Sequence, residues 1–200
     1  MVRYLFLAIL LLVALPATTY AQKSKMSKAE REAAWRAERL KKREAEKAKI
    51  AAEDSIAFVQ AVEALRSGSW ALEASNITFN NGVTRFVTSS TNYIAVNGGE
   101  GTVQTAFNNT NINSPNGLGG VTLEGNVWGE RMGTDAEGNV FYSCSIQGTG
   151  ISALIYVTLT ANTNQASANV NANYSGNRMT FSGYLYPYNS AGIFEGQPSY

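Results

Sequence analysis

The residue types that most often carry out catalysis or bind metals are almost absent from this sequence. Its 200 residues include no histidine and a single cysteine, Cys144. Histidine is the commonest general base and metal ligand, and a reactive thiol needs a neighbouring group that stabilises its thiolate. The sequence therefore predicts no catalytic residue, no bound cofactor and no metal site, and Cys144 is expected to be buried and inert.

The acidic residues of the C-terminal two-thirds do not suggest a catalytic pair. Glycoside hydrolysis needs two carboxyl groups about 5–9.5 Å apart. Glu124 and Glu130 differ by an even number of positions, so a regular strand would place both on one face but about 20 Å apart. Nothing in the sequence pairs either residue with a carboxylate on another strand. The acidic residues are interpreted as solvated, and a protein without enzymatic activity is favoured.

Three alternating tyrosines have the composition of a ligand-binding or partner-binding surface. Tyr184, Tyr186 and Tyr188 would lie on one face of a strand. Tyrosine combines apolar area with a polar tip, which suits a sugar ring or a partner chain. The alternative is that the N-terminal helix or the C-terminal tail covers them. Pro187 indicates an edge position or a strand end.

Residues 148–153 match the GxGxxA pattern of dinucleotide-binding proteins. In those proteins the motif opens a helix whose N-terminal amides hold a pyrophosphate. Here the residues that follow are β-branched and alternate in polarity, which predicts a strand. The match is interpreted as a hairpin turn, and no nucleotide cofactor is expected.

Ser55 is a candidate modification site. The tripeptide Asp54-Ser55-Ile56 resembles the short acceptor pattern for O-glycosylation of some exported bacterial proteins. It falls within a segment that is expected to be helical.

A glycine-dense stretch at residues 114–125 is expected to form a structural turn that runs into an alternating strand. Its Asn-Gly and Gly-Gly pairs tolerate the positive φ angles of a tight reversal, and its last glycine indicates a bulge or a close backbone approach. The residues of this turn motif are Pro115, Asn116, Gly117, Gly119, Gly120 and Gly125.

The chain divides into three parts that position these residues. The first part, residues 1–21, has the pattern of a secretory signal. Arg3 precedes an apolar run at residues 5–15, Pro16 breaks any helix, and Ala21 ends a segment that resembles a cleavage site. The apolar run is shorter than the roughly 20 residues that span a bilayer. We therefore expect export to the periplasm or beyond, without a membrane span after cleavage.

Residues 22–67 are expected to form a charged helix. Residues 22–66 carry 12 basic and 8 acidic residues, a net charge of +4, and good helix formers dominate. Ser27 and Glu30 fit a capping box. The second half has an apolar face that should dock on the following domain, namely Phe58, Val59, Val62 and Leu65. Interspersed glutamates dilute the positive field, so nucleic acid is not an expected partner, whereas contact with a membrane surface or partner stays open.

Residues 68–200 are expected to form a mainly β domain, an antiparallel meander closed into a sandwich or small barrel. Short alternating segments are separated by Gly and Asn turns throughout. They begin with residues 70–73 and 76–79, followed by a type I′ turn at Asn81-Gly82. On residues 121–128, 140–147, 151–159, 166–172 and 179–185, the odd or even positions form a continuous apolar face.

The chain resembles a domain-of-unknown-function family of small exported proteins from Gram-negative bacteria. The resemblance rests on residues 115–125, on residues 178–183, and on a signal followed by a helix. It covers about residues 50–196 and implies an envelope or secreted location with no established activity. Many relatives look like lipoproteins, whereas this chain lacks the cysteine that would be lipidated directly after the signal.

The sequence thus predicts a non-enzymatic, exported envelope protein that acts as a binding or structural module. The partner is open, and another envelope protein, a glycan or a lipid-like ligand would each fit. One alternative is a periplasmic carrier with an apolar small molecule inside an incompletely filled barrel. A further alternative is a small outer-membrane barrel, against which stand the charged helix and strands mostly shorter than about 9–11 residues.

Overall fold

The structure, a computed structural model, describes residues 26–107, 119–150, 152–173 and 178–196. Residues 1–48 and 49–200 form two compact units. In chain order the elements are α2 (Lys28–Ser67), β1 (Ser69–Phe79), β2 (Thr84–Phe86), η1 (Ser89–Thr91), β3 (Tyr93–Asn97), β4 (Glu100–Ala106), β5 (Gly120–Thr134), β6 (Val140–Gln147), β7 (Ser152–Leu159), β8 (Gln165–Ala172), β9 (Arg178–Pro187) and η2 (Tyr188–Ser190).

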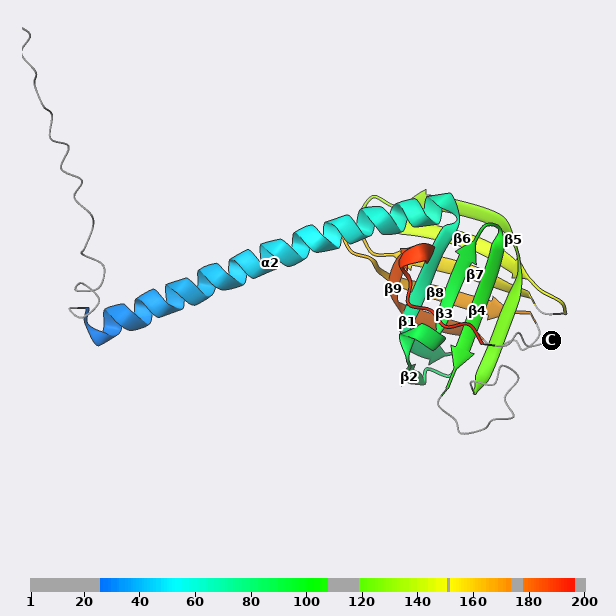
Figure 1. The fold of residues 1–200 in the computed structure, drawn as a ribbon, viewed down its shortest axis with the longest axis horizontal. Helices are drawn as coiled ribbons and strands as arrows, with labels where there is room; N and C mark the ends of the chain where they lie inside the picture. Colours follow the sequence, from blue (N-terminus) through cyan, green and yellow to red (C-terminus); the bar gives the residue numbers. More distant parts are fainter. Residues whose placement is uncertain (1–25, 108–118, 151, 174–177, 197–200) are drawn as a thin grey trace, which may run out of the picture. The chain divides into compact units, whose positions relative to one another are not determined.

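The strands form a closed antiparallel barrel (Figure 1). Within the described residues, the sheet order is β2-β1-β3-β4-β5-β6-β7-β8-β9, and pairing of β1 with β9 closes it. β2 pairs only with the second half of β1, while β3 pairs with the first half. The barrel proper therefore has eight strands. The predicted meander is confirmed, and of its two predicted closures the barrel is observed.

β1 is one strand of 11 residues, whereas the sequence predicts two segments. Its register against β9 shifts between Ala74 and Asn76, so Ser75 is accommodated in a bulge. The Ser75 hydroxyl donates a hydrogen bond to the Ser182 carbonyl at 3.1 Å. The prediction of two strands is wrong because the bulge absorbs the polar break without interrupting the pairing of β1 with β9.

The first hairpin turn differs from the predicted type I′ turn. That turn needs a positive φ at Asn81 and at Gly82, but of these two only Gly82 has one, at 81°. The Gly82 N–H donates to the Phe79 carbonyl at 2.9 Å, and the Val83 N–H donates to the Asn81 side chain at 3.1 Å. The Asn81 side chain thus stabilises the turn without a left-handed backbone.

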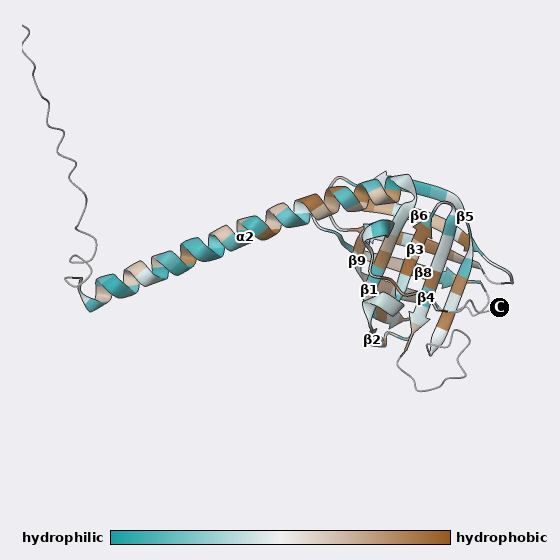
Figure 2. Cartoon of the chain, in the orientation of Figure 1, coloured by the Kyte–Doolittle hydropathy of each residue, from teal (hydrophilic) through white to brown (hydrophobic). Residues whose placement is uncertain are grey.

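The predicted alternation of β6 to β9 is confirmed, because every second side chain enters the barrel interior. With strands β1, β3, β4 and β5 these side chains form one contiguous apolar cluster. Figure 2 shows hydrophobic residues spaced along the strands of the barrel. Ile151, which the sequence places on the same face, lies outside the described residues. The buried residues of β6 to β9 are Val140, Tyr142, Cys144, Ile146, Ala153, Ile155, Val157, Leu159, Ala166, Ala168, Val170, Ala172, Phe181 and Leu185.

The second half of α2 packs on this interior, as predicted, but through a partly different face. Ala61, Ala64 and Leu65 are buried in the barrel cluster, and Phe58 and Val62 pack against it half-buried. Val59, expected on the docking face, is 65% exposed. The small side chains of Ala61 and Ala64 let the helix lie close to the barrel. Val59 lies outside this contact between helix and barrel.

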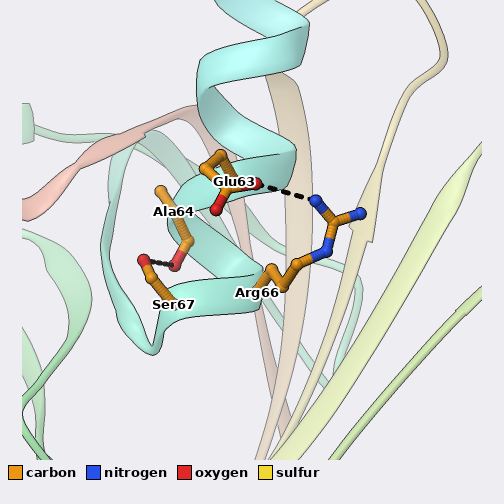
Figure 3. A network of polar contacts seen from close by, with 4 residues as sticks. All are labelled: Glu63, Ala64, Arg66 and Ser67. Carbon is orange, nitrogen blue, oxygen red and sulfur yellow. Dashed lines mark hydrogen bonds and ion pairs between the residues drawn. The ribbon is translucent and has the colours of Figure 1, made fainter.

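The helix ends in the glycine stop that the sequence indicates. Arg66 donates to Glu63 at 2.7 Å, and the Ser67 hydroxyl donates to the Ala64 carbonyl at 3.1 Å (Figure 3). Gly68 then adopts a φ of 64°, the left-handed conformation typical of a helix C-terminus. The chain thereby reverses directly into β1.

Residues 28–48 of α2 are exposed along their whole length. The predicted capping box is confirmed, because the Glu30 N–H donates to Ser27 Oγ at 3.2 Å and the Ser27 N–H donates to Glu30 Oε2 at 2.7 Å. Hydrogen bonds from the Ser27 backbone N–H, and then from its side chain, to the Glu30 carboxylate lower the pKa of Glu30. Among the described residues, no helix is both long enough and apolar enough to cross a membrane.

The C-terminal segment, residues 188–196, covers part of the outer face of the barrel. Gln104 is fully buried there and donates to the Phe194 carbonyl at 2.8 Å, while its own carbonyl accepts from the Gly196 N–H at 2.6 Å. Thr122 lies between the apolar positions of the predicted strand 121–128 but is fully buried, and its hydroxyl donates to Gln104 at 3.0 Å beneath this segment. Glu73 accepts from the Gly192 N–H at 2.6 Å.

We expect Glu124→Gln to stabilise the fold at pH 7 and to leave it unchanged near pH 4. Burial, then the charges of Glu195 and Glu100, raise the pKa of Glu124. A carboxyl whose pKa is raised by folding destabilises the folded state once it ionises, so stability is lost as the pH rises above the unfolded value of about 4.3. The gain should stay below about 1 kcal/mol because the site is near the surface. Urea unfolding of the wild-type and variant proteins at pH 7 and pH 4 measures this gain in the free energy of unfolding. The same difference between the two proteins at both pH values would contradict a raised pKa of Glu124.

Candidate functional site

The three tyrosines predicted as a surface lie in two environments. Tyr184 and Tyr186 face outward from β9, with Tyr184 exposed and Tyr186 half-buried. Burial, followed by the charge of Glu73, raises the pKa of Tyr186. Tyr188 leaves the strand in η2 and packs on an outer apolar cluster of Ala71, Tyr93 and Ala95. The structure therefore does not bring the three side chains together as one open platform.

The glycine turn motif lies partly outside the described residues, which exclude Pro115, Asn116 and Gly117. Gly119 has a φ of 81°, and Gly120 starts β5 against the Thr105 carbonyl. A Cβ atom at Gly125 would fall on the Gln147 carbonyl group of β6. The described glycines thus serve chain reversal and close strand approach.

Ser55 is exposed on α2, and its hydroxyl donates to the Ala51 carbonyl at 2.8 Å. Its role as a modification site stays a prediction. Residues 148–150 follow β6, residues 152 and 153 begin β7, and the two strands pair antiparallel with each other. The interpretation of this motif as a hairpin turn is confirmed.

Cys144 points into the barrel interior and is 3% exposed. Burial raises its pKa to about 12, so the thiolate is not accessible near neutral pH. The prediction that this cysteine is buried is confirmed. A group of three or more His, Cys, Asp or Glu side chains that could hold a metal ion is not found among the residues described.

A bulge in β5 decides which side chains gather on the outside of the barrel. Trp128 pairs with Ser145 and Arg131 pairs with Ser143, so three steps on β5 match two on β6. Gly129 has a φ of 67° at this point, the left-handed conformation that such bulges use. In a regular strand Trp128 and Arg131 would face opposite sides, but the bulge puts both on the outer face.

The same bulge changes the position of Glu130. A regular strand would place Glu124 and Glu130 on one face, but Glu130 accepts a hydrogen bond at 2.5 Å from the hydroxyl of the inward-facing Tyr142. The Tyr142 ring also meets Trp70 edge-on, with ring centroids 5.3 Å apart. Burial and the hydrogen bond to Glu130 raise the pKa of Tyr142. The expected common face of Glu124 and Glu130 is therefore wrong.

Large apolar side chains gather on the outer faces of β5, β6 and β7. The cross-strand rows Trp128–Ser145–Leu154, Arg131–Ser143–Tyr156 and Gly133–Phe141–Thr158 lie next to one another. Their exposed fractions are 60% for Trp128, 52% for Tyr156 and 44% for Phe141. We name this the β5–β7 surface, consisting of Trp128, Arg131, Phe141, Ser143, Ser145, Leu154 and Tyr156.

The β5–β7 surface contains a shallow pocket of about 310 Å³. Arg131, Phe141 and Tyr156 line it around Ser143. The two serines of β6 are small, so they form a low floor between the larger side chains of β5 and β7. Trp, Tyr, Phe and Arg are the residues enriched at recognition sites, whereas Lys, Glu and Asp are depleted there.

Comparison with family models gives a match over residues 52–185 to the domain of unknown function DUF4251. The chain belongs to the DUF4251 family. A search of curated proteins gives no match. The predicted resemblance to a domain-of-unknown-function family is therefore confirmed for the family, while its motif and the lipoprotein character of its relatives stay untested.

The DUF4251 chain is also similar to a crystal structure of a DUF4251 family protein from Bacteroides eggerthii DSM 20697. The two share 48% sequence identity with a TM-score of 0.63. The match covers 72% of this chain and 96% of the other. Because the other chain is matched over nearly its full length, the barrel described here is the fold of the DUF4251 domain.

Sequence reasoning places the residues of the β5–β7 surface in this DUF4251 domain on strands, with the exception of Arg131, but does not group them. A usable signal was present: the hairpin of residues 140–147 and 152–159 brings Phe141 and Tyr156 to one outer face. The presence of Arg131 on this surface could not be predicted, since Arg131 reaches that face only through the bulge at Gly129.

Proposed function

We propose that this DUF4251 protein is a non-enzymatic, exported binding module of the cell envelope that uses the outside of its barrel. The observation that carries the proposal is the β5–β7 surface, where exposed aromatic side chains and Arg131 surround a serine floor. Contiguous exposed apolar surface with a polar rim is typical of interaction sites. Export rests on residues 1–21, which read as a signal.

The absence of catalysis is part of this proposal and is supported by the chemistry of the site. Of the residues that form the β5–β7 surface, Arg131 is the one with a formal charge, so no carboxylate pair or nucleophile with a base faces the pocket. Cys144 is buried in the barrel interior, and Glu130 accepts the Tyr142 hydroxyl and does not line the pocket.

The barrel interior is a weaker candidate for ligand binding. Trp70 and Phe181, both fully buried, are among its largest side chains, and the described interior residues form one contiguous apolar cluster. An eight-stranded barrel is just wide enough for side chains to fill. This packing weighs against a carrier with an apolar ligand inside, and native mass spectrometry without a co-purifying small molecule would agree.

Co-sedimentation with insoluble cell-envelope material from Bacteroides eggerthii, the source of the similar DUF4251 protein, tests the proposal. The full-length protein should pellet saturably, and Trp128→Ala/Tyr156→Ala should lose at least about tenfold in affinity because aromatic anchors carry most binding energy. Phe86→Ala is the matched control, since Phe86 is 88% exposed on β2, away from the surface. Equal sedimentation of all three proteins, or release of soluble products from the material, would contradict the proposal.

A further inference from the structure

We infer that the β5–β7 surface binds a carboxylated sugar, as found in acidic polysaccharides. This inference rests on the proposed function, because it names the ligand class of the same surface. It is carried by three features: aromatic walls with a hydroxyl floor, a neighbouring row of amide side chains, and one unpaired guanidinium group.

The walls and floor have the dimensions of a sugar ring. Neighbouring strands lie about 4.8 Å apart, so side chains on β5 and β7 are roughly 10 Å apart across β6. Tyr156 on β7 offers aromatic area, and Ser143 offers a hydroxyl group between Tyr156 and Arg131 of β5. Trp128 adds aromatic area in the neighbouring row, beside Ser145. A pyranose ring has apolar C–H faces and polar hydroxyl edges, which match aromatic faces and a hydroxyl floor respectively.

The next strand adds hydrogen-bonding groups beside the aromatic wall. On β8, Asn169 is opposite Tyr156 and Asn171 is opposite Leu154, both exposed. The Thr180 hydroxyl donates to the Asn169 side-chain carbonyl at 2.8 Å, which orients that amide. Neutral amides both donate and accept, as sugar hydroxyls require.

Arg131 selects for a negative charge. It is exposed on the pocket wall, and the ion pairs found among the described residues, Lys49–Glu53 and Glu63–Arg66, do not include it. A guanidinium group recognises a carboxylate through two parallel hydrogen bonds. The sugar that fits this surface therefore carries a carboxylate.

An extended peptide is a poorer occupant of the same surface. β6 and β7 are each paired on both sides, whereas the pairing of β5 with β4 ends at Asn126 and leaves the rest of β5 paired with β6 alone. A peptide that lies over β6 and β7 meets no free strand edge, so its own N–H and C=O groups would lose water without gaining partners. A glycan has no such backbone requirement.

Calorimetric titration of the full-length protein with defined hexasaccharides tests the inference. The probes are hexamers of galacturonate, of mannuronate and of alternating glucuronate and N-acetylglucosamine, each compared with its methyl ester. At least one acid should bind saturably, and its ester should bind at least about tenfold more weakly, or about 1.4 kcal/mol, because the ester cannot form the charge-assisted hydrogen bonds.

Variants then assign the binding to the surface. Arg131→Gln should reduce the affinity for the acid to that of the ester and leave the ester unchanged, while Tyr156→Ala should weaken both. Arg85→Gln is the matched control, since Arg85 is an exposed arginine on β2. Thermal unfolding of each variant checks that the fold is retained.

Three outcomes overturn the inference. If acid and ester bind equally, or if Arg131→Gln leaves the affinity for the acid unchanged, the surface does not select a carboxylate. If no hexamer binds, the ligand is not a carboxylated sugar. In each case surface-dependent co-sedimentation with envelope material would leave the proposed binding role standing, whereas its loss would remove that role as well.

Discussion

Gly183→Ala is expected to destabilise the protein by about 3 kcal/mol, at the upper end of the usual cost of overpacking. Gly183 lies on β9 opposite Ala74 of β1, at the pairing that closes the barrel. A Cβ atom there would fall on the Glu73 carbonyl oxygen. Backbone cannot move aside as a flexible side chain can, so the two strands must separate. Thermal unfolding should show a midpoint lower by roughly 10 °C.

Gly133→Ala is the matched control for this substitution. Gly133 also lies on a strand, but no atom comes within 4 Å of an added Cβ. Its stability should change by less than about 0.5 kcal/mol. If the two alanine variants unfold at the same temperature, the close contact between β1 and β9 at the barrel closure is not present.

Leu65→Ala is expected to destabilise the protein by about 3 kcal/mol, within the range for buried leucines. Leu65 is 2% exposed and belongs to the apolar cluster of the barrel interior. Loss of its side chain removes apolar burial and leaves a cavity where the helix packs. Urea unfolding followed by circular dichroism should show a lower midpoint.

Leu40→Ala provides the comparison within the same helix. Leu40 is 58% exposed, so its substitution should change stability by less than about 0.5 kcal/mol. Equal effects of the two substitutions on the free energy of unfolding would mean that the two halves of α2 stabilise the fold to the same extent. That result would contradict the docking of the second half.

The local features of the fold were predictable because they depend on short-range chemistry. The capping box of Ser27 and Glu30 is a four-residue pattern, and the inward faces of β6 to β9 follow from alternation alone. Barrel closure was left open against a sandwich, since it depends on the pairing of β1 with β9, more than 100 positions apart in the chain.

Non-local contacts explain what the sequence did not reveal. Thr122 is buried because the C-terminal segment covers it through Gln104, and nothing near Thr122 in sequence indicates this. Arg131 joins Trp128 on the outer face because Gly129 allows a bulge. The residues after Trp128 show no alternation, so neither the length of β5 nor its register against β6 could be predicted from the sequence. The candidate site consequently emerged only from the structure.

The three tryptophans of the chain provide the most direct test of where a ligand binds. Trp35 is exposed on the first half of α2, Trp70 is fully buried in the barrel interior, and Trp128 lies on the β5–β7 surface. An ¹H–¹⁵N spectrum reports the indole N–H of each one separately. We propose to titrate the protein with soluble oligosaccharides released from the envelope material with which it sediments. The indole signal of Trp128 should shift while those of Trp35 and Trp70 stay in place, and a shift of Trp70 or Trp35 with Trp128 unchanged would contradict binding at the β5–β7 surface.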